Sequence, residues 1–164
     1  MYLIFDFDGT IIETMNINYK KLKNELKEIL NVNTITPMYE IINNHIEKKQ
    51  ICFNLIDKYE MNCLNQIKPK LDILDLYKKS PLKIILSRNG RQIIENFFKK
   101  NNLPLPDFIC CRDNCINLKP NIEQINIIFK KFNYLNKNNI CIVGDSWHDE
   151  QLSENIGCSY KLVK

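Results

Sequence analysis

Short apolar runs divide the chain, and each of them ends in polar or turn-forming residues. The clearest runs cover residues 2–5, 82–86, 107–110 and 140–143, and a weaker fifth run covers 159–163. Short apolar runs bounded by turn formers are typical of strands that are buried on both faces, as in a parallel sheet. The pattern therefore predicts four buried parallel strands and a weaker fifth one.

Helical periodicity fills the gaps between these runs. Apolar side chains recur at helical spacing within residues 91–100 and 122–132, and further helices are predicted over 71–79 and 148–155. Strands that alternate with helices indicate a right-handed parallel sheet with helices on its faces. We therefore expect an α/β fold with a Rossmann-like core.

The segment after the first strand breaks this alternation. It contains no convincing strand, and its apolar spacing predicts three helices, over residues 17–30, 38–48 and 50–59. An all-helical insertion at this point predicts a small cap over the carboxyl edge of the sheet. We accordingly divide the chain into a catalytic core, residues 1–13 and 70–164, and a helical cap, residues 14–69.

Length and composition narrow the class of protein. The chain has 164 residues and a formal net charge of +4, which suits one α/β domain with a small insertion. The basic residues are scattered along predicted helices, which favours solvated helix faces over a nucleic-acid groove. No apolar stretch is long enough to predict a membrane span. We expect a monomer or weak dimer.

The seven cysteines bear on the compartment. They are odd in number and no secretory signal accompanies them, which predicts reduced thiols in a cytoplasmic protein. Cys110, Cys111 and Cys115 cluster, but their spacing does not match a zinc knuckle, so we expect no metal there.

Candidate chemistry lies where the apolar runs end. Carboxylates, a hydroxyl and an amine follow separate predicted strands or begin the helix beside one: Asp6, Asp8, Ser87, Lys119, Asp145 and Asp149. The carboxyl ends of parallel strands share one edge of a sheet, so these groups should meet in one crevice. Carboxylates this close favour a hard divalent cation or a shared proton. The set suits an anionic substrate held beside a divalent cation.

The residues around these groups resemble the motifs of a known family, the haloacid-dehalogenase-like hydrolases. The segments that carry the resemblance are Asp6-Phe7-Asp8-Gly9-Thr10-Ile11, Leu86-Ser87-Arg88-Asn89, Lys119-Pro120 and Gly144-Asp145-Ser146-Trp147-His148-Asp149. Their order and spacing match across the core. Arg112-Asp113, shortly before Lys119, resembles the phosphoglycolate-phosphatase-like branch of this family.

The resemblance implies a role for each residue. Asp6 would attack phosphorus to form an aspartyl-phosphate, and Asp8 would act as acid and then base. Mg²⁺ would be held by Asp6, the Asp8 backbone carbonyl and Asp145. Asp149 would be a further ligand, or would support these ligands without touching the metal. The remaining groups are Ser87 and Lys119, which would stabilise the phosphoryl group, and Thr10, Arg88 and Asn89, which would bind substrate. Asp8 favours phosphoryl chemistry over carbon–halogen cleavage.

These motifs predict a magnesium-dependent phosphatase for a small phosphorylated metabolite, such as a sugar phosphate or nucleotide. Two other hypotheses stay open: a phosphomutase or phosphotransferase of the same fold, and a non-catalytic binding module.

Several residues also have structural interpretations. Ser87 could cap the helix that follows it, and Asp149 could favour a helix N-terminus by its charge. Trp147 could stack on a substrate ring, but we expect it to pack against the sheet edge or the cap. His148 could be a proton shuttle, but we expect an exposed polar residue. Arg88 could contact the cap instead of the substrate.

Overall fold

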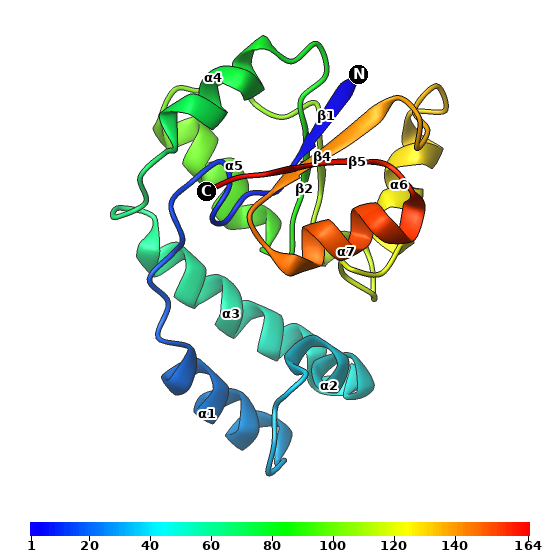
Figure 1. Cartoon of the computed structure of the whole chain (residues 1–164). Helices are drawn as coiled ribbons and strands as arrows, with labels where there is room; N and C mark the ends of the chain where they lie inside the picture. Colours follow the sequence, from blue (N-terminus) through cyan, green and yellow to red (C-terminus); the bar gives the residue numbers. More distant parts are fainter.

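The computed structural model describes all 164 residues. Five parallel strands form one sheet in the order β3-β2-β1-β4-β5 (Figure 1). The strands are β1 (Tyr2–Phe5), β2 (Ile84–Leu86), β3 (Phe108–Cys110), β4 (Ile140–Gly144) and β5 (Ser159–Leu162). The predicted parallel α/β fold is confirmed, and the weak fifth run does form a strand.

The two faces of the sheet are covered by different helices. Successive strand residues point to opposite faces, so Phe5 and Ile85 contribute to one core cluster while Ile4 and Ile84 contribute to the other. The helices on the first face are α4 (Leu71–Lys79) and α5 (Arg91–Lys100). Those on the second face are α6 (Glu123–Lys131) and α7 (Trp147–Ile156). The sheet is thus buried on both sides, as the continuous apolar runs predict.

Three helices stand beyond the carboxyl ends of the strands (Figure 1). They are α1 (Tyr19–Leu30), α2 (Met38–Asn44) and α3 (Lys49–Cys63), and a 3₁₀ turn (Ile46–Lys48) separates the last two. The predicted helix over 38–48 is therefore broken at His45, and the one predicted over 50–59 is longer than expected.

The helical insertion packs tightly on the core. The buried side chains of α1, Leu22, Leu26 and Leu30, belong to the same apolar cluster as Phe5 and Phe7 of the core. Helix α3 also contacts α5. A single apolar cluster therefore runs from one face of the sheet into the insertion and holds these helices over the strand ends. No helix in the structure combines the length and the apolar character that crossing a membrane requires.

Candidate active site

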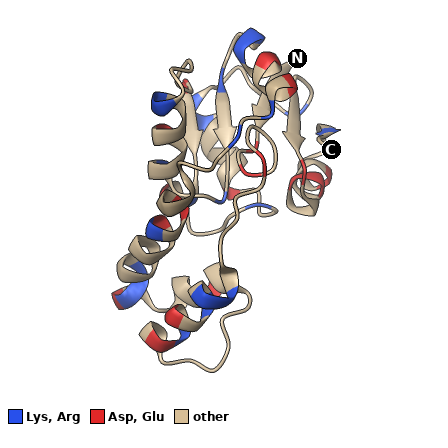
Figure 2. Ribbon diagram, turned by 90° about the vertical axis from the view of Figure 1, so that its left-hand side faces the viewer, with Lys and Arg blue, Asp and Glu red and all other residues tan.

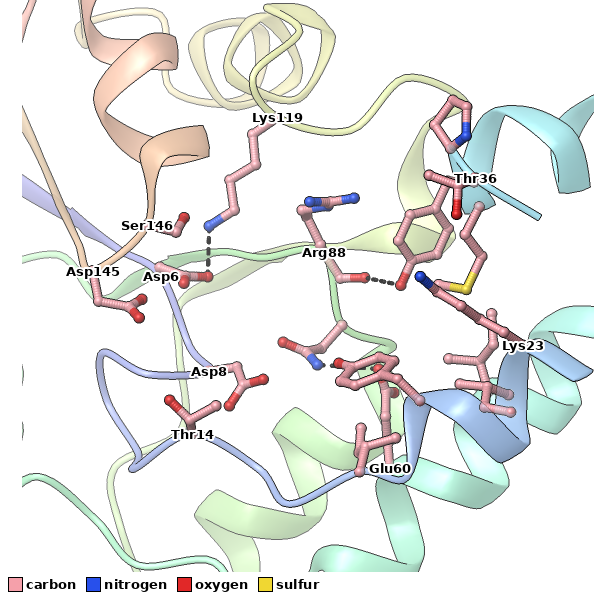
Figure 3. A pocket seen from close by; sticks show the side chains of 18 residues that line it. Asp6, Asp8, Thr14, Lys23, Thr36, Glu60, Arg88, Lys119, Asp145 and Ser146 are labelled. Carbon is pink, nitrogen blue, oxygen red and sulfur yellow. Dashed lines mark hydrogen bonds and ion pairs between the residues drawn. The ribbon is translucent and has the colours of Figure 1, made fainter. Parts of the chain in front are cut away.

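A cavity of about 490 Å³ lies between the carboxyl edge of the sheet and helices α1–α3 (Figure 3). The structure brings six of the predicted residues to its wall: Asp6, Asp8, Arg88, Asn89, Lys119 and Asp145. The insertion supplies much of the opposite wall, including Ile17, Leu22, Tyr39 and Ile56. The other predicted residues, Thr10, Ser87 and Asp149, are fully buried and do not line the cavity.

Lys119 lies at the centre of the charged groups. Its Nζ is 2.6 Å from Asp6 Oδ1 and 2.6 Å from Asp149 Oδ1, and all three side chains are buried. Burial of Asp6 outweighs the attraction of Lys119 and raises the pKa of this carboxyl to about 7. Burial alone would lower the pKa of Lys119, but Asp6 and Asp149 together raise it, which keeps the amine charged.

Asp8 faces the same cavity from the turn that follows β1. Its Oδ1 accepts a hydrogen bond from the Met15 backbone N–H at 2.7 Å. Burial raises the pKa of Asp8 to about 6, although this hydrogen bond acts in the opposite direction. A carboxyl that titrates near neutral pH can both donate and accept a proton under physiological conditions.

Gly9 and Thr10 fix the position of Asp145. Gly9 has φ +77°, and a Cβ at this position would overlap the Asp145 carboxylate. The Thr10 hydroxyl donates to Asp145 Oδ1 at 3.2 Å. Thr10 is buried and its hydroxyl is engaged in this contact, and its role in binding substrate stays a prediction. Asp6, Asp145 and Asp149 each offer an oxygen within 4.8 Å of the others.

Asp149 also begins helix α7. Its Oδ2 accepts from the Ser146 hydroxyl at 2.6 Å and from the Ser146 backbone N–H at 3.2 Å. The serine and the acid three residues later thus form a capping box. Both carboxylate oxygens of Asp149 are used, one by Lys119 and one by Ser146.

Ser87 is held by its neighbours behind the cavity wall. Its hydroxyl donates to Asn89 Oδ1 at 2.8 Å and accepts from the Asn89 N–H at 3.2 Å. Helix α5 begins at Arg91 with Gly90 as its N-cap, so the alternative that Ser87 caps this helix is wrong. Gln124, which sequence reasoning missed, donates to the Ser87 carbonyl at 2.9 Å and accepts from the Lys119 N–H at 2.8 Å. It joins the two loops.

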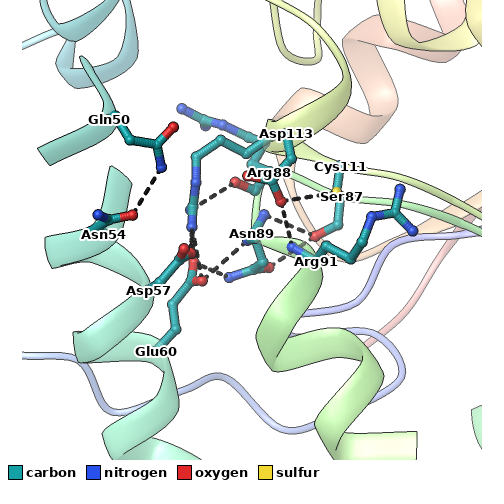
Figure 4. A network of polar contacts seen from close by, with 12 residues as sticks. Gln50, Asn54, Asp57, Glu60, Ser87, Arg88, Asn89, Arg91, Cys111 and Asp113 are labelled. Carbon is teal, nitrogen blue, oxygen red and sulfur yellow. Dashed lines mark hydrogen bonds and ion pairs between the residues drawn. The ribbon is translucent and has the colours of Figure 1, made fainter. Parts of the chain in front are cut away.

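A second cluster of charges links helix α3 to the core (Figure 4). The fully buried Arg112 donates to both oxygens of Glu60, at 2.9 and 3.1 Å, and also pairs with Asp57. Glu60 accepts in addition from the Asn89 side-chain amide and the Gly90 N–H, both at 3.1 Å. Nothing in the sequence marked Glu60, since acids on predicted helices are common. Asn89, predicted to bind substrate, is engaged by Ser87 and Glu60.

Arg88 lies on the other side of the cavity, over the Tyr39 ring at 5.3 Å from its centroid. A guanidinium nitrogen of Arg88 contacts His148 Nε2. His148 is half-buried, so the expectation of an exposed residue is wrong, and burial lowers the pKa of His148 to about 4. Trp147 stacks on His148 and is 63% exposed, which contradicts its predicted packing against the sheet edge or the cap.

Comparison with known proteins places the chain in a family. Residues 3–163 match the family of haloacid dehalogenase-like hydrolases, so the chain belongs to this family and the resemblance of its motifs is confirmed. No curated protein gives a significant match to the sequence.

Solved structures of the same fold are numerous. A haloacid dehalogenase-like hydrolase from Bacteroides fragilis superposes with a TM-score of 0.70 at 19% identity, covering 100% of this chain and 88% of that one. The magnesium-bound hydrolase YfnB from Bacillus subtilis gives 0.62 at 18% identity, covering 99% and 86%. A protein from Lactobacillus plantarum described as a phosphoglycolate phosphatase gives 0.59 at 17% identity, covering 98% and 84%. At these identities the likeness establishes the fold.

Proposed function

We propose that this protein is a magnesium-dependent phosphatase that hydrolyses a small phosphate monoester through an aspartyl-phosphate on Asp6. The observation that carries the proposal is the Asp6–Lys119 pair at 2.6 Å on the wall of a cavity that Asp8 also lines. This arrangement supplies a nucleophile, a cation for the phosphoryl group and an acid/base in one place. Two proteins of the same fold support the proposal, one described as a phosphoglycolate phosphatase and one bound to magnesium.

The donor atoms fit a hard divalent cation. Asp6, Asp145 and Asp149 bring three carboxylates within 4.8 Å of one another, and a single lysine amine lies among them. Oxygen donors of this kind suit Mg²⁺. Asp149 already uses both of its oxygens, so we assign Asp6, Asp145 and the Asp8 backbone carbonyl as direct ligands and Asp149 as the partner of Lys119. Bound Mg²⁺ would neutralise charge on the phosphoryl oxygens.

The protein's own groups account for the proton and phosphoryl transfers. A carboxylate oxygen of Asp6 bonds to phosphorus as the ester P–O bond breaks, and Asp8 gives its proton to the departing alkoxide. Asp8 then takes a proton from water, whose oxygen attacks the phosphorus of the aspartyl-phosphate. The bond between phosphorus and the Asp6 oxygen breaks, and inorganic phosphate is released. The raised pKa of Asp8, about 6, suits both of its steps.

Lys119 stays charged throughout, because its ion pairs with Asp6 and Asp149 raise the pKa of the amine. It lies where negative charge accumulates on the phosphoryl group, and a fixed buried cation stabilises that charge without reorganising. Asp149 keeps the amine in place with one oxygen and the start of α7 with the other.

A phosphate-release screen over phosphorylated metabolites tests the proposal. Wild-type protein with Mg²⁺ should release phosphate from at least one of them, and chelation of the metal should abolish the activity. The Asp6→Asn variant should lose at least about 10⁴-fold in kcat. Asp75→Asn, an exposed acid on α4, serves as the control. Isomer formation without phosphate release would instead identify a phosphomutase, and retained turnover in Asp6→Asn would reject the mechanism.

A further inference from the structure

A second cavity of about 460 Å³ adjoins the first. It lies between helix α2, the loop that precedes α6 and the start of α7. The two cavities share Arg88, Lys119 and Tyr39 as lining residues. Lys119, whose amine is 2.6 Å from Asp6, thus contributes to the walls of both cavities. A substrate held at Asp6 could therefore extend into it.

Trp147, the only tryptophan of the chain, lines this second cavity. One part of its ring stacks on His148, with centroids 3.9 Å apart and planes inclined by 28°. The side chain is nevertheless 63% exposed, although tryptophan is usually highly buried on average. His148 is in turn held by Arg88. Trp147 is therefore supported by His148 on one side and largely exposed to solvent, and we call it the aromatic platform.

Unpaired polar atoms accompany the platform. Asn43 donates its side-chain amide to the Ile116 carbonyl at 2.8 Å, and since a carbonyl only accepts, this contact fixes which way the Asn43 amide points. Asn43 Oδ1 is left buried without a partner, and so is Arg88 Nε. Buried polar atoms normally have partners. Both residues line the second cavity, so its wall contains one buried acceptor and one buried donor that have no partner within the protein.

We propose that the second cavity is the base-binding part of the site, and that the substrate is a nucleoside monophosphate whose base stacks on Trp147 while its phosphate lies at Asp6. A planar ring with both donors and acceptors on its edge is the chemistry that the platform, Asn43 Oδ1 and Arg88 Nε together fit. Stacking on an aromatic side chain is worth about 5- to 150-fold in affinity. This inference rests on the proposed function and names its substrate class.

The single tryptophan gives a direct measure of binding that does not depend on turnover. Asp6→Asn protein with Mg²⁺ is titrated with each of the common nucleoside monophosphates and with ribose 5-phosphate, which lacks only the base. At least one nucleotide should quench the Trp147 fluorescence to saturation, and ribose 5-phosphate should not. Asn43→Ala should weaken that nucleotide about tenfold or more, whereas Asn44→Ala, an exposed neighbour on the same helix, should not.

Turnover by otherwise wild-type protein supplies the second measurement. Trp147→Ala should lower the ratio of kcat/KM for the nucleotide to kcat/KM for ribose 5-phosphate by about 5-fold or more. Saturable quenching in a protein that hydrolyses nothing would refute the proposed function but keep the base site. Phosphate release with no quenching by any nucleotide would keep the phosphatase and overturn the base site. Fluorescence that changes with protein concentration alone would also overturn it, since Trp147 would then pack against another copy of the chain.

Discussion

Two clusters of charge in this protein look alike in composition and differ in their surroundings. In one, Arg112 pairs with Glu60 and Asp57; in the other, Lys119 pairs with Asp6 and Asp149. Each cluster has one buried cation between two carboxylates. In the first cluster, which we call closed, protein donors engage both oxygens of Glu60. In the second, which we call open, Asp6 faces a cavity.

The Arg112 cluster is closed. Both oxygens of Glu60 accept from Arg112, and backbone and amide donors from Gly90 and Asn89 complete them. A side chain on Gly90 would overlap Asp57 and Arg112, so the glycine lets helix α3 approach the core closely. The carboxylate of Glu60 is thus fully engaged, although Arg112 Nε has no partner, and these contacts fix one arrangement of α3 on the sheet.

The Lys119 cluster is open. Asp6 faces the cavity, Asp145 and Asp8 add further carboxylates, and no cation besides Lys119 forms an ion pair with this group. The pKa of Asp6 is raised to about 7 and that of Asp8 to about 6, mainly by burial. The excess of carboxylates over cations marks a place where a metal ion or a substrate would complete the balance. The engagement of the carboxylates therefore distinguishes the Arg112 cluster from the proposed catalytic cluster.

The largest effect is expected from breaking the closed cluster. Arg112→Met leaves Glu60 buried, charged and without its ion partner, and should cost about 3–5 kcal/mol in the free energy of unfolding measured in urea. Adding Glu60→Gln should recover much of the loss, because the unpaired charge is then gone. Lys99→Met, which removes only an exposed pair with Glu95, should cost about 1 kcal/mol or less. Equal losses in the two single variants would refute the distinction.

The matching change in the open cluster should affect activity more than stability. Lys119→Met removes the cation beside the phosphoryl group and should lower kcat by about 10²- to 10³-fold. Its stability should recover when Mg²⁺ is added, because the metal replaces the lost charge, whereas that of Arg112→Met should not. Lys99→Met, an exposed lysine of α5, is the control for both measurements. Full activity in Lys119→Met would contradict the assignment.

Metal binding should stabilise the fold through the open cluster. At a Mg²⁺ concentration of 100 times its Kd, the free energy of unfolding should rise by about 2.7 kcal/mol. Asp145→Asn should reduce this gain sharply, and Asp75→Asn should leave it intact. Thermal unfolding with and without the metal measures the difference. A gain that survives in Asp145→Asn would place the ion elsewhere.

The smallest effect concerns pH in the absence of metal. The pKa of Asp8 is raised in the folded state to about 6, above its ordinary value of 3.8. Its contribution to stability is therefore complete below pH 3.8 and lost as the pH rises through about 6. Between pH 5 and pH 7.5 this carboxyl should lower the free energy of unfolding by on the order of 1 kcal/mol, since solvent access screens part of the effect. Asp8→Asn, which keeps an acceptor for the Met15 N–H, should flatten the profile; an unchanged profile would show that Asp8 is not perturbed.

Much of the fold and of the charged site could be predicted from local pattern. The apolar runs predicted every strand of the sheet. Strands buried on both faces must be apolar throughout, which explains the clear runs, whereas the weak run forms the exposed edge strand β5. Asp6, Asp8, Lys119 and Asp145 follow strands or begin loops at the same edge, so the parallel topology alone places them together. The break at His45 and the full length of α3 were missed, since local propensity sets helix ends poorly.

Other contacts could not be predicted because the two partners are distant in the sequence. The Thr10 hydroxyl donates to Asp145, 135 residues away. Asn89 is engaged by Glu60, 29 residues away on a cap helix, and His148 by Arg88, 60 residues away. No periodicity or motif records such contacts.

The sequence by itself determined the parallel sheet, the helical insertion after β1 and the set of acids and lysine at the strand ends, because these follow from local order and from the geometry that all parallel sheets share. Only the tertiary structure decided which buried charges are saturated and which are open. It alone paired Glu60 with Arg112, left Asp6 facing a cavity, and exposed Trp147 beside two unpaired polar atoms. The physical reason is that a hydrogen bond or an ion pair depends on position in space, and helix α3 meets the core only after the chain has folded.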